Sequence, residues 1–132
     1  MAEKSTRAAV RDHLATNCPS FTGGFFYPQI ADSNTTKPFG VLRMGPEDRA
    51  RRQGNTRTFY VHVHAAKDAY DDLDTLCRSV VAALDGAKVA CGSASGKTFW
   101  VTPYHVGTTA DANDEDRETI FRIIEFEVVT GK

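Results

Sequence analysis

The stretch RTFYVHVHAAKDAYDDLDTLCRSVVAALDG, residues 57–86, contains the two strongest patterns in the 132-residue chain. Its first part alternates apolar residues with others, as a half-buried strand does, and the apolar ones are Phe59, Val61, Val63 and Ala65. Its second part repeats apolar residues at the spacing of a buried helical stripe, and these are Leu73, Leu76, Cys77, Val80 and Leu84. The stretch therefore predicts a strand at 57–65 followed by a helix at 68–85.

Both ends of this helix carry signals of their own. Asp68 is placed to act as the N-cap, and Asp71 and Asp72 fall in the first turn, where the helix dipole favours negative charge. Gly86 follows the last apolar residue and predicts the C-terminal stop.

Weaker patterns on either side complete the predicted set of elements. They indicate a helix at 3–16, which Pro19 ends, strands at 39–44, 98–106 and 120–129, and an extra short strand near Phe25. Gly45-Pro46 is expected to end the strand at 39–44, and Pro103 predicts an edge strand or a bulge. The order α, β, β, α, β, β suits an α+β fold. We expect one domain over 1–132, a mostly antiparallel sheet of about four to five strands, and two helices packed on one face.

Composition limits the classes of function. A net charge of -1 gives no global electrostatic case for nucleic-acid binding, and no apolar run is long enough to span a membrane. The three cysteines, Cys18, Cys77 and Cys91, form no CxxC pair, which indicates reduced thiols. The stretch GSASGKT, residues 92–98, lacks the spacing of a phosphate-binding loop and is expected to be a flexible loop.

The pair His62 and His64 raises the question of a metal site. Strand residues two positions apart share a face, so both imidazoles can reach one zinc ion, and Asp68 is the obvious third ligand. The other interpretation is that both histidines line the more polar face of a half-buried strand together with Tyr60. There they would pair across the sheet with carboxylates such as Glu125 and Glu127. This second interpretation predicts an interface of aromatic and polar residues, with no metal and no cofactor.

Charged residues form two separate clusters. Arg49, Arg51, Arg52 and Arg57 lie within nine residues, and residues 111–118 (DANDEDRE) are expected to form an exposed acidic loop. If copies of the chain associate, the basic segment of one copy is expected to meet the acidic surface of the next. Whether the arginines instead touch DNA is left open by the sequence.

The segment from residue 38 to 86 resembles the tail terminator (tail completion) proteins of long-tailed bacteriophages. The pieces that match the family pattern are Pro38-Phe39, the polar segment 49–57, the strand 59–63, the step AYDD at 69–72 and the helix end ALDG at 83–86. The N-terminal helix and the final strand also fit, so the resemblance extends over residues 3–129.

The resemblance implies a virion protein with no catalytic activity. Such a subunit is expected to form a ring, as a hexamer, at the head-proximal end of the tail tube, where it stops tube polymerisation. Its partners would be other copies of itself, the major tail tube protein and the head–tail connector or adaptor. Genomic DNA would only pass through the lumen, and assembly would take place in the host cytoplasm without a membrane. Two alternatives stay open: a small metal-dependent enzyme built on His62 and His64, and a head–tail adaptor or minor tail protein.

Overall fold

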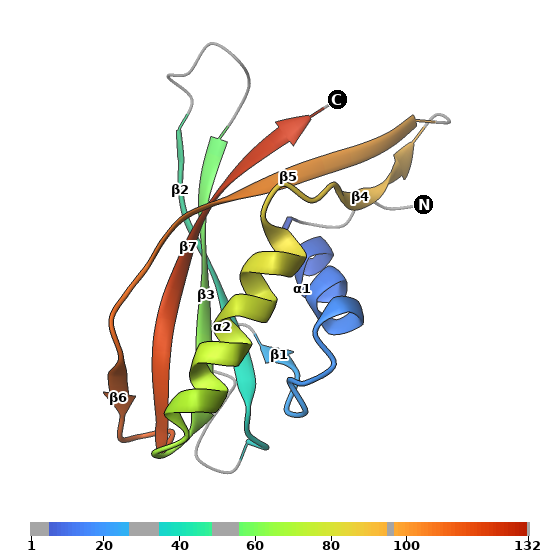
Figure 1. Ribbon diagram of the computed structural model, residues 1–132. Helices are drawn as coiled ribbons and strands as arrows, with labels where there is room; N and C mark the ends of the chain where they lie inside the picture. Colours follow the sequence, from blue (N-terminus) through green and yellow to red (C-terminus); the bar gives the residue numbers. More distant parts are fainter. Residues whose placement is uncertain (1–5, 27–34, 49–55, 95–96, 132) are drawn as a thin grey trace.

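The fold is known from a computed structural model that describes residues 6–26, 35–48, 56–94 and 97–131 (Figure 1). It contains two α-helices, α1 (Thr6–Asn17) and α2 (Tyr70–Leu84). The strands are β1 (Phe25–Phe26), β2 (Phe39–Asp48), β3 (Thr56–Ala66), β4 (Val89–Ala94), β5 (Lys97–Thr108), β6 (Ala112–Asp114) and β7 (Thr119–Gly131).

The strands form a single sheet in the order β1-β2-β3-β7-β5-β4, and β6 pairs with β7 beyond the end of β5. All neighbours are antiparallel except β1 and β2, which run parallel. The α+β class and the mostly antiparallel sheet are therefore confirmed, as is the short strand near Phe25. Five of the described strands have six residues or more, and β1 and β6 are short additions at the edges.

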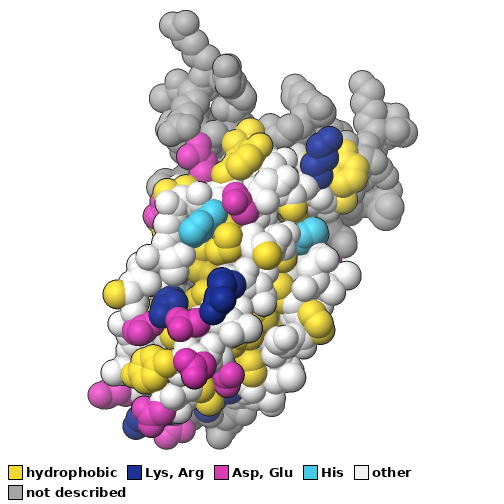
Figure 2. All heavy atoms as spheres, in the orientation of Figure 1, with side chains coloured by type: hydrophobic (Ala, Val, Ile, Leu, Met, Phe, Trp, Pro, Cys, Tyr) yellow, Lys and Arg dark blue, Asp and Glu magenta, His cyan; other side chains and the backbone are white. Residues whose placement is uncertain are grey.

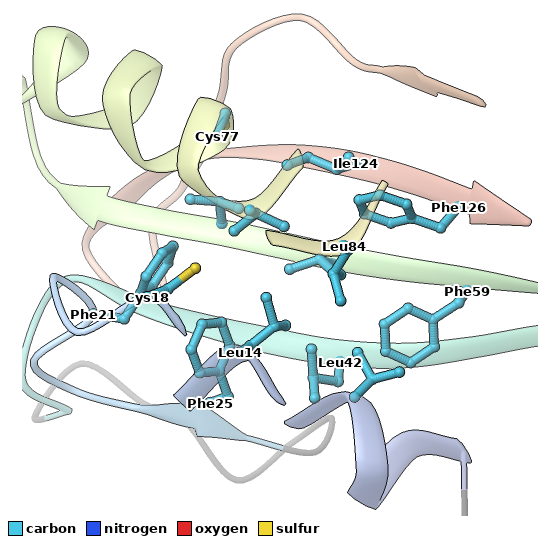
Figure 3. Close-up of a cluster of buried hydrophobic side chains, with 14 of the residues drawn as sticks. Leu14, Cys18, Phe21, Phe25, Leu42, Phe59, Cys77, Leu84, Ile124 and Phe126 are labelled. Atoms are coloured by element: carbon cyan, nitrogen blue, oxygen red, sulfur yellow. The ribbon is translucent and has the colours of Figure 1, made fainter. Parts of the chain in front are cut away.

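Both helices pack on the same face of the sheet, as predicted. Figure 1 shows α1 and α2 on one side of the long strands. Val10 and Leu14 of α1 belong to the same buried cluster as the stripe of α2, whose five predicted members are all buried. The close-up in Figure 3 shows side chains of both helices and of β2, β3 and β7 meeting in this core. On β3 and β7 the buried set alternates along the chain, and it includes Phe59, Val61, Val63, Ala65, Ile124, Phe126 and Val128.

The start of α2 differs from the prediction. The helix begins at Tyr70, its N-cap is Ala69, and no side chain caps it. Asp68 instead takes a positive φ of 68° in the turn after β3, so its side chain does not reach the first free N–H groups of the helix. Asp71 and Asp72 do lie in the first turn. At the other end Gly86 adopts a φ of 74°, which is the left-handed conformation expected just after a helix.

Two strands are longer than their sequence pattern indicates. Gly45-Pro46 does not end β2, because the strand absorbs both residues in an irregularity between Met44 and Glu47 and continues to Asp48. The stretch 92–98 is not simply a loop either. Its first three residues belong to β4 and its last two to β5, while residues 95–96 lie outside the described part.

Pro103 lies on β5 between β4 and β7, so β5 is not an edge strand along its whole length. Pairing with β4 stops at Val101, however, and the carbonyl of Pro103 accepts a hydrogen bond from Gly86 N at 2.7 Å. The peptide edge of Pro103 therefore faces away from β7, and its missing N–H interrupts no bond to that strand. The predicted bulge is present a few residues later, between His105 and Gly107.

The predicted acidic loop at 111–118 is partly ordered as β6 and a turn to β7. It is joined to the helix layer by Arg122 of β7, which forms ion pairs of 2.6 Å with Asp111 and with Asp74 of α2. In the space-filling view, Asp and Glu side chains gather toward the end of the molecule where α2 begins (Figure 2). One guanidinium thus joins β7, α2 and the segment just before β6.

Removing a member of the α2 stripe should destabilise the fold. Leu76→Ala is expected to lower the free energy of unfolding by about 2–5 kcal/mol, because it leaves a cavity under the helix where Leu76 is 4% exposed. Arg78→Ala on the exposed side of the same helix should change it by roughly 0.5 kcal/mol or less. Urea unfolding followed by circular dichroism measures both, and equal effects would contradict the assigned packing.

Candidate interface on the uncovered sheet face

The second face of the sheet carries no helix in the described part of the chain, and we call it the uncovered face. Alternation along β3 places Tyr60, His62 and His64 there, opposite the buried apolar set. Tyr60 and His62 are half-buried, as expected for an interface residue, but His64 is only 2% exposed. His64 therefore lies on the predicted face of the strand but is enclosed there, so its side chain is not accessible to a partner.

The strand register decides what these side chains meet. On β7, Tyr60 lies opposite Glu125, whereas His62 lies opposite Ile123 and His64 opposite Phe121. The predicted pairing of the histidines with Glu125 and Glu127 is thus wrong, because the glutamates align with Tyr60 and Thr58 instead. On β2, Arg43 lies opposite Tyr60, and the row Arg43, Tyr60, Glu125 crosses three strands of the face.

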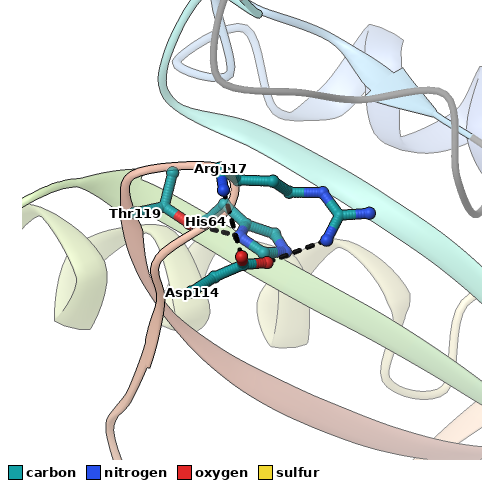
Figure 4. Close-up of polar contacts among 4 residues, drawn as sticks. All are labelled: His64, Asp114, Arg117 and Thr119. Carbon is teal, nitrogen blue, oxygen red and sulfur yellow. Dashed lines mark hydrogen bonds and ion pairs between the residues drawn. The ribbon is translucent and has the colours of Figure 1, made fainter.

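His64 is enclosed by aromatic rings and by the turn between β6 and β7. Its imidazole stacks on Phe39 at a centroid distance of 4.7 Å and on Phe121 at 5.1 Å. Its Nδ1 hydrogen-bonds with Oγ1 of the buried Thr119 at 2.7 Å (Figure 4). The aromatic stack and the hydroxyl together fix the imidazole in a small second cluster on the uncovered face, next to Phe39 and Val41.

An ion pair closes the turn beside this imidazole. Arg117 binds the carboxylate of Asp114 through its guanidinium at 2.8 Å and through its backbone N–H at 3.1 Å (Figure 4). Burial acts to raise the pKa of Asp114, but the hydrogen bonds from Arg117 outweigh burial and hold that pKa below its ordinary value. Asp114 therefore stays ionised, and its charge is directed to Arg117.

Both histidines are neutral under ordinary conditions. Burial lowers the pKa of His64 from 6.5 to about 4, since the nearby charge of Asp114 does not offset the loss of hydration. Burial also lowers the pKa of His62, and the positive charges of Arg43 and Arg117 lower it further. Two guanidinium groups thus lie near one neutral imidazole on this face.

Two adjoining hollows follow the uncovered face and share Arg43, His62 and Ile123. One has a volume of about 750 Å³ and extends past Tyr60 and Glu125 toward Val106 of β5. The other has a volume of about 440 Å³ and extends toward His64 and the Asp114–Arg117 pair. We call the two together the Arg43 groove. Apolar side chains such as Phe121, Ile123 and Val106 line it together with charged and polar ones, a mixture that protein interfaces also show.

The metal hypothesis gains no support from the geometry. Nowhere in residues 6–26, 35–48, 56–94 and 97–131 do three or more His, Cys, Asp or Glu side chains gather so as to hold a metal ion. Nδ1 of His64 is engaged by Thr119, and Asp68 lies in the turn that leads to α2 rather than beside the pair.

No helix in the described part of the chain is long and apolar enough to cross a membrane.

The predicted arginine cluster is only partly visible. Arg49, Arg51 and Arg52 lie outside the described residues, so their role stays a prediction. Arg57 is exposed on β3 and its Nε donates a hydrogen bond to the carbonyl of Gly45 at 3.3 Å. By alternation it points away from the face that holds Tyr60 and His62, so it does not join them in one site.

Sequence reasoning did not identify four residues of this surface, namely Arg43, Asp114, Arg117 and Thr119. Arg43 had a local signal, because it alternates with the buried Leu42 and so falls on the outer face of its strand. The other three approach His64 through contacts that join β3 to the β6–β7 turn, 50 or more residues further along the chain. No local pattern reveals such a contact.

Comparisons with known proteins give matches among solved structures. No protein-family model and no curated protein sequence matches the chain. The chain is similar to a solved structure described as "Virion of native gene transfer agent (GTA) particle", with a TM-score of 0.59 and 18% sequence identity. The similarity covers 96% of this chain and 96% of that one. At this identity it shows that the two chains share a fold from end to end.

His64 should make stability depend on pH. Its folded pKa of about 4 lies below the unfolded value of 6.5, so the unfolded chain binds the proton first, and stability falls as pH drops from 6.5 toward 4. Between pH 7 and pH 5 the loss should be about 2 kcal/mol. Urea unfolding at the two pH values measures it, with His64→Phe combined with Thr119→Val as the control. An equal loss in this double variant would exclude His64 as the cause.

Proposed function

We propose that this protein is a structural subunit of a phage-like particle that caps the head-proximal end of the tail tube. In this function it stops tube polymerisation and provides the surface to which the head is joined. The observation that carries the proposal is the end-to-end fold similarity to a chain of a gene transfer agent virion. The resemblance of residues 38–86 to tail terminator proteins is an independent argument for the specific place in the tail.

The two faces of the sheet suit a protein that functions by binding other proteins. The helices bury one face, while the other keeps a groove with aromatic, apolar and charged side chains that is open to a neighbour. Such a mixture is ordinary in protein interfaces. We propose a ring of copies, with six as the expected number, that binds the major tail tube protein on one side and the head–tail connector on the other. Genomic DNA passes through its lumen, and no cofactor or covalent chemistry is required.

The similarity to a virion chain supports a head–tail adaptor or a minor tail protein as well, and tail length separates these functions. Deleting the gene from the phage or phage-like element that encodes it should give overlong tail tubes without heads, because nothing stops polymerisation. Electron microscopy of lysates measures tube length, and a plasmid copy of the gene should restore it. Tails of normal length beside unjoined heads would assign the adaptor function instead.

Contacts between copies should be sensitive to salt. The chain has near-neutral net charge but separate acidic and basic clusters, so opposite charges on neighbouring copies attract each other. Association of the purified protein, measured by sedimentation velocity, should weaken between about 20 mM and 300 mM NaCl as screening increases. Association that does not change with salt would contradict a contact based on charge.

A further inference from the structure

Arg43 is an uncompensated charge in the groove that bears its name. It is exposed on β2, lines both hollows and lies close enough to His62 to lower the pKa of that imidazole. Within the described residues its guanidinium has no hydrogen-bond or ion-pair partner. The nearest acidic residue in the strand register, Glu125, is separated from it by Tyr60 of the intervening strand. Neighbouring strands are about 4.8 Å apart, so the two backbones are roughly 10 Å apart.

In the smaller hollow of the groove, which Glu125 does not line, the other charged groups already have partners or are neutral. Arg117 is neutralised by Asp114, and His62 and His64 carry no charge at neutral pH. Beside them lie the apolar side chains of Phe121 and Ile123, which shield an incoming group from water. The surroundings of Arg43 therefore favour one anionic group small enough to enter a hollow of about 440 Å³, and a carboxylate has that chemistry.

The same chain has carboxylates without partners in the turn between β6 and β7. Glu115, Asp116 and Glu118 are exposed and have no ion pair among the described residues. Other acids nearby are already compensated, because Asp74 and Asp111 bind Arg122 and Asp71 and Asp72 lie at the positive end of the α2 dipole. The three turn residues, which we call the acidic turn, are therefore the exposed anions best suited to meet a cation.

Within one chain the acidic turn and Arg43 do not meet. Thr119, at the end of the turn, pairs with Ala66, whereas Arg43 pairs with Tyr60, and these two β3 residues lie six positions apart, or about 20 Å. A second copy brings the two charges together without any change of fold. Because the acidic turn and Arg43 are different patches of the surface, the contact joins unlike patches of two copies, and such a contact can repeat around a closed ring.

We propose that the Arg43 groove receives a carboxylate of the acidic turn from a second copy of this chain. The inference rests on the proposed function only in requiring that copies associate. It differs from the pairing expected from the sequence, in which the acidic segment meets the arginines at 49–57. In the contact, Arg43 binds the carboxylate and His62 borders it, so association should raise the pKa of His62 toward its ordinary value.

Sedimentation velocity of full-length variants at about 20 mM NaCl, where screening is weak, tests the contact. Arg43→Gln should weaken association by about tenfold, and so should the neutral turn Glu115→Gln/Asp116→Asn/Glu118→Gln. Arg43→Lys, which keeps the charge, should retain part of the affinity. Arg78→Gln, on the helix side, is the matched control and should associate like the wild type. Unchanged melting temperatures show that each variant folds.

A mixing experiment shows whether the two surfaces meet each other. The Arg43→Gln chain keeps the turn and the neutral-turn chain keeps the groove, so an equimolar mixture should form heterodimers although neither chain associates well alone. The His62 imidazole resonance should titrate at higher pH in the mixture. The proposal is overturned if the mixture stays monomeric while the wild type associates, or if the wild type itself stays monomeric. It is also overturned if neutralising Arg51 and Arg52, rather than Arg43, abolishes association. Tail-length control in the deletion experiment is independent of all these outcomes.

Discussion

The two-residue periodicity of β3 is the constraint on which the rest of the structure depends. This strand lies between β2 and β7 and pairs with β7 along its whole length, from Thr56 to Ala66. Alternate residues therefore form either the core under the helices or the wall of the Arg43 groove. A slip of one residue would exchange the two sets, exposing Val61 and burying Tyr60 without a partner. Core and candidate interface are thus specified by the same eleven residues.

The features of the fold that depend on residues close in sequence could be predicted from the spacing of apolar residues. The apolar stripe of α2, the alternation of β3 and β7 and the two-helix, one-face architecture all follow from residues close in sequence. The register between β3 and β7 does not, and a shift of two residues separates the observed pairing of His62 with Ile123 from a pairing with Glu125. Short strands such as β6 carry too few residues for a pattern. The burial of His64 comes from rings on β2 and β7 and from a distant turn, so it depends on tertiary pairing alone.

The charges of this protein fall into a compensated set and an uncompensated set. Arg117 and Arg122 bind Asp114, Asp74 and Asp111, and these pairs join the β6–β7 turn, β7 and α2. Arg43 and the acidic turn have no such role within the described fold. Net charge conceals this division, because a value of -1 is compatible with either arrangement. Charges that do not hold the subunit together are those available to select a neighbour.

Residues just after α2 also occupy backbone groups of β5 that another strand could otherwise bind. Where β4 stops, the N–H of His105 donates to Asp85 Oδ1 at 2.9 Å and the carbonyl of Pro103 accepts from Gly86. The helix terminus thereby occupies backbone groups of β5 that would otherwise bind the edge of any passing strand. Exposed edge groups of this kind are a general hazard for strand-to-strand aggregation. Two hydrogen bonds reduce that hazard here, so this stretch of β5 is left to meet other molecules through its side chains.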